Sequence, residues 1–122
     1  MENVQIIINN IINGNISERQ LQKYLDSDLV LVKVNAILAV LRKKNYTHDV
    51  VNKLNKISKN ILHEPKVMGQ WTTGHYAIAV LYLLNTDETR RMYDNNVCKL
   101  DENTKGSIEN LIKQIMLSYL EK

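Results

Sequence analysis

The chain carries LAVLRKKN at residues 38–45, and 40 residues later it carries the similar stretch IAVLYLLN at residues 78–85. The two stretches share an alanine, a valine, a leucine and a final asparagine, Asn45 or Asn85, at the same relative positions. The helices predicted after the two stretches also start at equivalent positions, near Thr47 and Asp87. Because a period of about 40 residues is typical of arrays of paired helices, we expect one helical unit to occur twice in this chain.

The rest of the sequence also favours helices. Pro65 is the only proline and there are four glycines in 122 residues, so few residues would interrupt a helix. Apolar residues recur at spacings of three and four, as at Leu54, Ile57 and Ile61. The segment between the fourth and fifth helices is predicted to be a loop. We predict seven helices, at residues 2–12, 17–26, 29–43, 48–62, 71–85, 87–95 and 105–121.

Strands are the alternative for two of these segments. Residues 4–12 and 29–41 are rich in β-branched side chains, which are common in strands. The second segment, however, is long and unbroken for a strand. Ser17 and Gln20 also have the spacing of a capping box, which favours a helix start. We therefore predict an all-α protein that forms a single domain over residues 1–122.

The sequence LQKYLDSDLVLVKVNAILAVLRKKN at residues 21–45 resembles a HEAT repeat. It has a first helix with leucines, an acidic turn, and a second helix with Ala36 and Ala39, small residues that allow close helix packing in that family. The resemblance implies a compact HEAT/armadillo-like array. Its units would span about 17–45 and 47–85, and the terminal helices would cap the array.

The second unit departs from this pattern at two positions. Thr73 and Gly74 stand where the first unit has Lys33 and Val34. The resemblance concerns the fold, and a shared fold does not specify a chemistry. Function has to be sought in particular residues.

Composition narrows the class of function. The formal net charge is +3 with 24% charged residues, which falls short of the dense basic charge of a nucleic-acid-binding arm. Cys98 is the only cysteine, so an internal disulfide is excluded, and a free thiol suits a reducing compartment. The first residues lack the features of a signal peptide, and no apolar run is long enough to span a membrane. We expect a cytoplasmic protein that does not associate with membranes.

Motifs of catalysis and metal binding are missing from the sequence. It contains no Gly-rich phosphate loop, GxSxG, CxxC or HExxH. His63, Glu64 and His75 carry metal-ligating atoms, but their spacing matches no standard zinc pattern. Cys98 is expected to be a small core residue rather than a nucleophile. We predict a protein that is not an enzyme, with no metal site and no cofactor.

One group of residues fits a protein-binding surface. On the predicted helix at 71–85, three of them lie opposite the expected core face. The other two lie on the equivalent side of the helix 40 residues earlier, which would be its neighbour in a paired-helix array. A mixture of Trp, Tyr, His, Arg and Asn suits a protein–protein hot spot. The alternative is that the first or last helix covers this face. The predicted partner-binding residues are Asn35, Arg42, Trp71, His75 and Tyr82.

The overall character of the chain resembles the small immunity proteins of bacterial contact-dependent growth inhibition systems. That resemblance implies a toxin inhibitor that covers the active site of a toxin domain, such as a nuclease. The positive net charge departs from the pairing of acidic immunity proteins with basic nucleases, so it implies a neutral or acidic partner or an interface on the aromatic patch. Two alternatives are a nucleic-acid-binding HEAT-like domain, disfavoured by the modest charge, and an adaptor or regulatory subunit.

Overall fold

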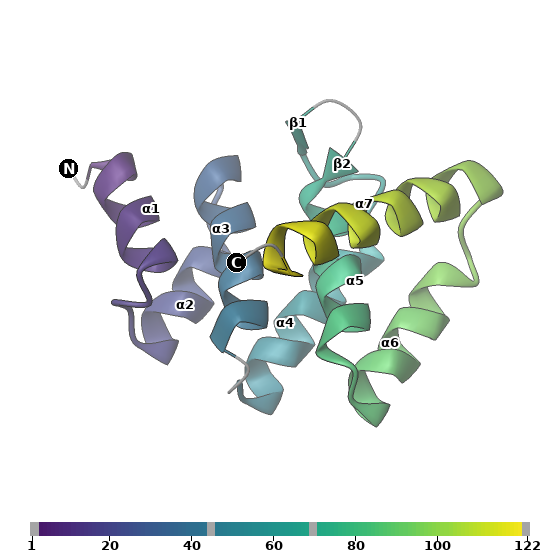
Figure 1. Ribbon diagram of the computed structural model, residues 1–122, viewed down its shortest axis with the longest axis horizontal. Coiled ribbons are helices and arrows are strands. Elements are labelled where there is room, and N and C mark those ends of the chain that lie inside the picture. Colours follow the sequence, from purple (N-terminus) through teal and green to yellow (C-terminus); the bar gives the residue numbers. More distant parts are fainter. Residues whose placement is uncertain (1–2, 44–45, 69–70, 121–122) are drawn as a thin grey trace.

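The computed structural model describes residues 3–43, 46–68 and 71–120, and these ranges form a compact all-α domain (Figure 1). This confirms the predicted fold class. A short hairpin of β1 (Lys66–Met68) and β2 (Trp71–Thr72) is the exception to the helices in these ranges. The helices are α1 (Val4–Ile12), α2 (Glu18–Leu25), α3 (Val30–Lys43), α4 (His48–Lys59), α5 (Thr73–Leu84), α6 (Asp87–Val97) and α7 (Glu102–Leu120).

The helices form two layers that alternate along the chain. In one layer α1 contacts α3, α3 contacts α5 and α5 contacts α7, while in the other α2 contacts α4 and α4 contacts α6. This succession is what an array of paired helices requires. Figure 1 shows that α7 departs from it, because α7 crosses the face of α5 instead of running alongside it. Membership of the HEAT family stays a prediction.

The core consists of two clusters that meet at α5. The larger cluster is built from α1 to α5 and includes Leu25, Ile37 and Leu81. The smaller one joins the other side of α5, at Ile78, to the apolar face of α7. Burial on both sides explains why the α5 sequence is apolar nearly all round. No helix in the described part of the chain is long and apolar enough to cross a membrane.

Helix caps account for most of the helix boundaries. The predicted capping box is present at α2, where the Gln20 backbone N–H donates to the Ser17 hydroxyl at 3.2 Å. Asn85 ends α5 in the left-handed conformation, as an asparagine can (φ 57°), whereas its counterpart Asn45 lies outside the described residues. The start of α7 precedes the predicted one by three residues, because the Asp101 carboxylate accepts a hydrogen bond from the Thr104 N–H at 2.7 Å.

The hairpin was missed by the sequence analysis, which predicted a loop followed by a helix from residue 71. In the structure β1 pairs antiparallel with β2, Lys66 opposite Thr72, and α5 begins at Thr73. Thr72 is the N-cap of α5 and has an extended backbone, with φ −94° and ψ 170°. An N-cap residue is not yet helical, so Trp71 and Thr72 are free to pair with β1.

Candidate protein-binding cleft

The last helix divides the predicted patch. Because α7 packs on the side of α5 away from the larger core, Ile78 is fully buried and His75 is only 6% exposed. At the centre of the predicted patch, around His75 and Ile78, the last helix therefore covers the face of α5, as the alternative interpretation of the sequence had it. Trp71 and Tyr82 remain partly exposed, and they line different cavities on the two flanks of α7.

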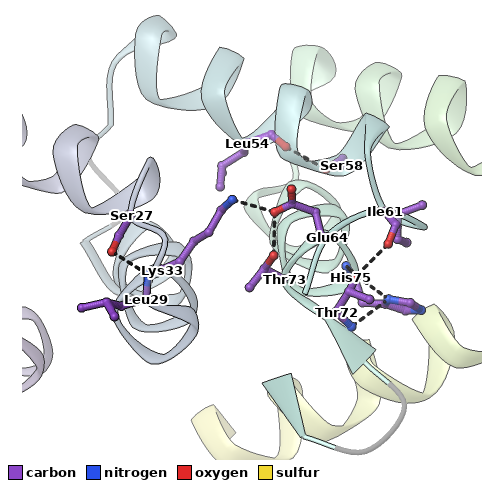
Figure 2. Close-up of polar contacts among 10 residues, drawn as sticks. All are labelled: Ser27, Leu29, Lys33, Leu54, Ser58, Ile61, Glu64, Thr72, Thr73 and His75. Atoms are coloured by element: carbon purple, nitrogen blue, oxygen red, sulfur yellow. Dashed lines mark hydrogen bonds and ion pairs between the residues drawn. The ribbon is translucent and has the colours of Figure 1, made fainter. Parts of the chain in front are cut away.

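His75 is part of the start of α5 (Figure 2). Its ring Nδ1 accepts a hydrogen bond from the Thr72 backbone N–H at 3.1 Å, and the His75 N–H donates to the Thr72 hydroxyl at 3.3 Å. The Thr72 hydroxyl in turn donates to the Ile61 carbonyl at 2.9 Å. Burial lowers the pKa of His75, which favours the neutral ring that this cap requires. Little of the ring is left for a partner to contact.

A second polar cluster, also shown in Figure 2, joins α3 to the start of α5. The Lys33 ammonium lies 2.6 Å from Glu64 Oε1, and the Thr73 hydroxyl donates to the same oxygen at 2.6 Å. Lys33 and Thr73 occupy the equivalent positions of the two repeat units, so the departure from the HEAT pattern at Thr73 has a structural role. Both side chains bind one carboxylate that follows α4.

Gly74, the second departure, is explained by a close approach of α5 to the turn after α4. A Cβ atom placed on Gly74 would lie 2.5 Å from the Cα atom of Ile61. No side chain fits at that distance from a neighbouring backbone. The start of α5 is thus fixed by a glycine contact, a capping box and a shared carboxylate.

Tyr82 is occupied by contacts within the molecule. The Arg90 guanidinium carbon lies 3.7 Å from the centroid of the Tyr82 ring, and Arg90 Nε donates to the Tyr82 carbonyl at 2.9 Å. The Tyr93 ring is 4.9 Å away, centroid to centroid. These contacts join α5 to α6, so Tyr82 contributes to packing at this flank.

The other flank holds a cleft of about 320 Å³ between α3, α5 and α7, which we name the α3–α7 cleft. Trp71 lies in it with a fixed orientation. Its Nε1–H donates to the Ser107 carbonyl at 3.2 Å, and its ring meets that of Tyr76 edge to face at 6.4 Å. The cleft is lined by Leu38, Arg42, Trp71, Tyr76, Leu111, Gln114, Ile115 and Ser118.

Arg42 is the one charged residue among the described residues that line the α3–α7 cleft. It is exposed in the last turn of α3, and its side chain makes no ion pair or hydrogen bond with any described residue. The Tyr76 hydroxyl and the Gln114 amide also have no hydrogen bond within the described ranges. Burial raises the pKa of Tyr76, so its hydroxyl keeps its proton and can donate. Three donors from three helices therefore line one cleft.

The structure brings together two of the five predicted residues, Arg42 and Trp71. Asn35 lies apart on α3, where its amide donates to the Leu31 carbonyl at 2.7 Å. Tyr76 and the α7 residues of the cleft, which include Gln114, were not predicted from the sequence. Their helical spacing is visible in the sequence, but the direction in which α7 crosses α5 is not.

The residues considered for metal binding are not gathered into a site. No three His, Cys, Asp or Glu side chains come together as metal ligands within the described ranges. Glu64 pairs with Lys33, and His75 caps α5. Cys98 is exposed, so its predicted place in the core is wrong. It follows the last residue of α6 as the C-cap, and its thiol donates to the Asn95 carbonyl at 3.3 Å.

Comparison with protein-family models, curated proteins and solved structures finds no match for this chain. Kinship with HEAT proteins and with immunity proteins therefore stays a prediction from the sequence. The α3–α7 cleft is the feature of the structure that bears most directly on function.

Proposed function

We propose that this chain is a non-catalytic protein-binding module that holds its partner in the α3–α7 cleft. The observation that carries the proposal is the convergence of Trp71, Tyr76 and Arg42 on one cleft, where Arg42 forms no ion pair with any described residue. Trp, Tyr and Arg are the residue types most enriched at the energetic centres of protein interfaces. Their neighbours Leu111 and Ile115 are buried, so the cleft has an apolar floor.

Preorganisation of the cleft supports the proposal. Trp71 is fixed by its hydrogen bond to Ser107 and by its edge-to-face contact with Tyr76. A side chain that is already ordered loses little conformational entropy when a partner binds. The helix that carries Tyr76 is also fixed at its start, where Gly74 packs against the backbone of Ile61.

The partner class that we propose is a toxin domain whose active site the module covers in a one-to-one complex. Support comes from the overall resemblance to small immunity proteins and from a cleft that offers a cation and hydrogen-bond donors. A basic toxin surface would be repelled by Arg42, so the surface in contact with the cleft is neutral or acidic in this proposal.

Nucleic-acid binding is the second candidate, and one cavity favours it. A space of about 280 Å³ between α4 and α6 is lined by Lys59, by Lys99 and by three asparagines, and none of its described lining residues is acidic. Two lysines would neutralise few phosphates, so affinity at moderate salt would be low. A protein partner accounts better for the aromatic cleft.

The proposal is tested by a pull-down of the tagged chain from its native cells at moderate salt, read by mass spectrometry. We expect a near-stoichiometric protein partner with the wild type and with Lys56→Glu, and loss of that partner with Arg42→Glu. Both residues are exposed in the last turn of a helix, so the two variants are matched in charge change and in helix-dipole cost.

Two results would contradict the proposal. Recovery of the same protein at the same yield with Arg42→Glu would place the interface elsewhere. Recovery of nucleic acid that is removed by salt, without any protein partner, would favour the second candidate.

A further inference from the structure

The lining of the α3–α7 cleft changes from buried and apolar at its floor to exposed and polar at its rim. At its floor lie Leu111 and Ile115, which are 1% and 5% exposed. Trp71 and Tyr76 are partly buried and form an aromatic wall. At the rim the exposed residues are Arg42, Gln114 and Ser118. A ligand that fills the cleft must therefore be apolar at one end and polar at the other.

Among the residues that the structure describes, the rim has one positive charge, that of Arg42, and no negative charge to balance it. The Ser118 hydroxyl already donates to the Gln114 backbone carbonyl at 3.2 Å, which leaves the Arg42 guanidinium and the Gln114 amide as open donors. A guanidinium presents its N–H groups in a planar fork that matches a carboxylate with two hydrogen bonds. The charge and the donors thus favour a carboxylate at the rim.

We infer that the partner places a protein segment in this cleft in which an aspartate or glutamate stands next to a large apolar side chain. The carboxylate pairs with Arg42, and the apolar side chain lies against Trp71 and Tyr76 above Leu111. This inference rests on the proposed protein-binding function and specifies the chemistry of the partner.

Other occupants fit the cleft less well. A wholly apolar segment would cover Arg42 without giving it a counter-charge, and burying an unpaired charge is costly. A basic segment would be repelled. A free phosphate would satisfy Arg42 and leave the apolar wall of Trp71 and Tyr76 in water.

The inference is tested by selecting peptides from a random display library on the full-length chain. Wild type and Lys56→Glu are expected to select peptides with an acidic residue next to Trp, Phe, Leu or Ile. These peptides are expected to bind Arg42→Glu at least about tenfold more weakly, the loss typical of one charged hydrogen-bonded pair. A third variant, Ser118→Tyr, adds bulk at the exposed rim and is expected to abolish binding, and thermal unfolding checks that all variants fold.

The outcomes separate the inference from the function on which it rests. Peptides that are lost with Ser118→Tyr but carry no acidic residue would overturn the inference and leave the binding cleft standing. Peptides that bind Ser118→Tyr and wild type equally, or no selected peptides at all, would overturn both.

Discussion

The two flanks of α7 contain similar residues that differ in how many contacts they make within the molecule. On one flank Trp71 lies in a cleft with Arg42, which makes no ion pair with any residue that the structure describes. On the other flank Tyr82 lies under Arg90, which binds both the ring and the carbonyl of that tyrosine. The cavity there is also lined by Glu109 and Lys113, so it contains both signs of charge.

The comparison teaches that residue type alone does not identify a binding surface. An aromatic residue and an arginine occur on both flanks, but Arg90 is bound to Tyr82, whereas Arg42 makes no ion pair or hydrogen bond with a described residue. Unused donors beside a preorganised aromatic ring are available to a partner, whereas the pair of Tyr82 and Arg90 already serves the packing of α5 on α6.

The largest expected effect concerns Gly74, at the start of the helix α5 against which α7 packs. Gly74→Ala would place a methyl group against the backbone of Ile61, so we expect a loss of about 3 kcal/mol in the free energy of unfolding, at the upper end of overpacking costs. Gly106→Ala is the control. Gly106 has open space around it in α7, and we expect a gain of about 0.5–1 kcal/mol from helix propensity.

Urea denaturation of the two variants measures this difference. Equal stabilities for Gly74→Ala and wild type would show that α5 does not approach the turn after α4 as closely as described. In that case the Gly74 contact would no longer support the inference that the cleft is preorganised.

The next largest effect separates the two aromatic residues. Trp71→Ala is expected to weaken partner binding by about 2 kcal/mol, or about thirtyfold, because it removes the wall of the cleft. Tyr82→Ala is expected to leave affinity unchanged and to lower the free energy of unfolding by about 2 kcal/mol. Titration calorimetry with the recovered partner, together with urea denaturation, gives both quantities. Loss of affinity with Tyr82→Ala but not with Trp71→Ala would place the interface on the flank of Tyr82 and Arg90.

Substitution of the two arginines is expected to change the free energy of unfolding by smaller amounts, and by different amounts on the two flanks. Arg90→Ala removes a cation–π contact and a hydrogen bond, so we expect the free energy of unfolding to fall by about 1 kcal/mol. Arg42→Ala removes a side chain that makes no ion pair or hydrogen bond within the described ranges, so it is expected to change stability by less than about 0.5 kcal/mol. If Arg42→Ala proved as destabilising as Arg90→Ala in the same denaturation experiment, Arg42 would have a structural role.

The smallest effect concerns His75, which lies between the flanks. Its pKa is lowered by burial below 6.5, so the unfolded chain binds more protons than the folded chain as the pH falls through that value. The contribution of His75 is therefore full above pH 6.5 and is lost progressively below it. His75→Gln keeps an acceptor for the Thr72 N–H, and urea titrations at pH 7.5 and 5.5 should show a smaller loss on acidification for this variant than for wild type. An equal loss in both proteins would assign the pH dependence to other groups.

Much of the fold was predictable because its signals are local. The apolar period of α4 and the capping box of Ser17 and Gln20 need only neighbouring residues. The hairpin was missed because Thr72 and His75 form a capping box outside the usual Ser/Thr and Glu/Gln pattern. The start of α7 was missed because Asp101 was not considered as its cap.

The candidate site was predictable only in part. Arg42 and Trp71 were found because equivalent faces of neighbouring helices lie near each other in a paired-helix array. Tyr76 and Gln114 were not found, because helical period gives the apolar face of α7 but not the direction in which it crosses α5. The pairing of Tyr82 with Arg90 was not predicted, because it depends on how α6 returns toward α5.

Site-specific photo-crosslinking in the native cells tests whether the partner binds in the α3–α7 cleft. A photoreactive residue is placed at Ser118, on the rim of the α3–α7 cleft, or at Lys113, on the opposite flank of α7. Both positions are exposed on one helix, so they differ in flank and little else. We predict one crosslinked protein from position 118 and none from position 113. A crosslink from position 113 alone would contradict this prediction and assign the binding surface to the flank of Tyr82 and Arg90.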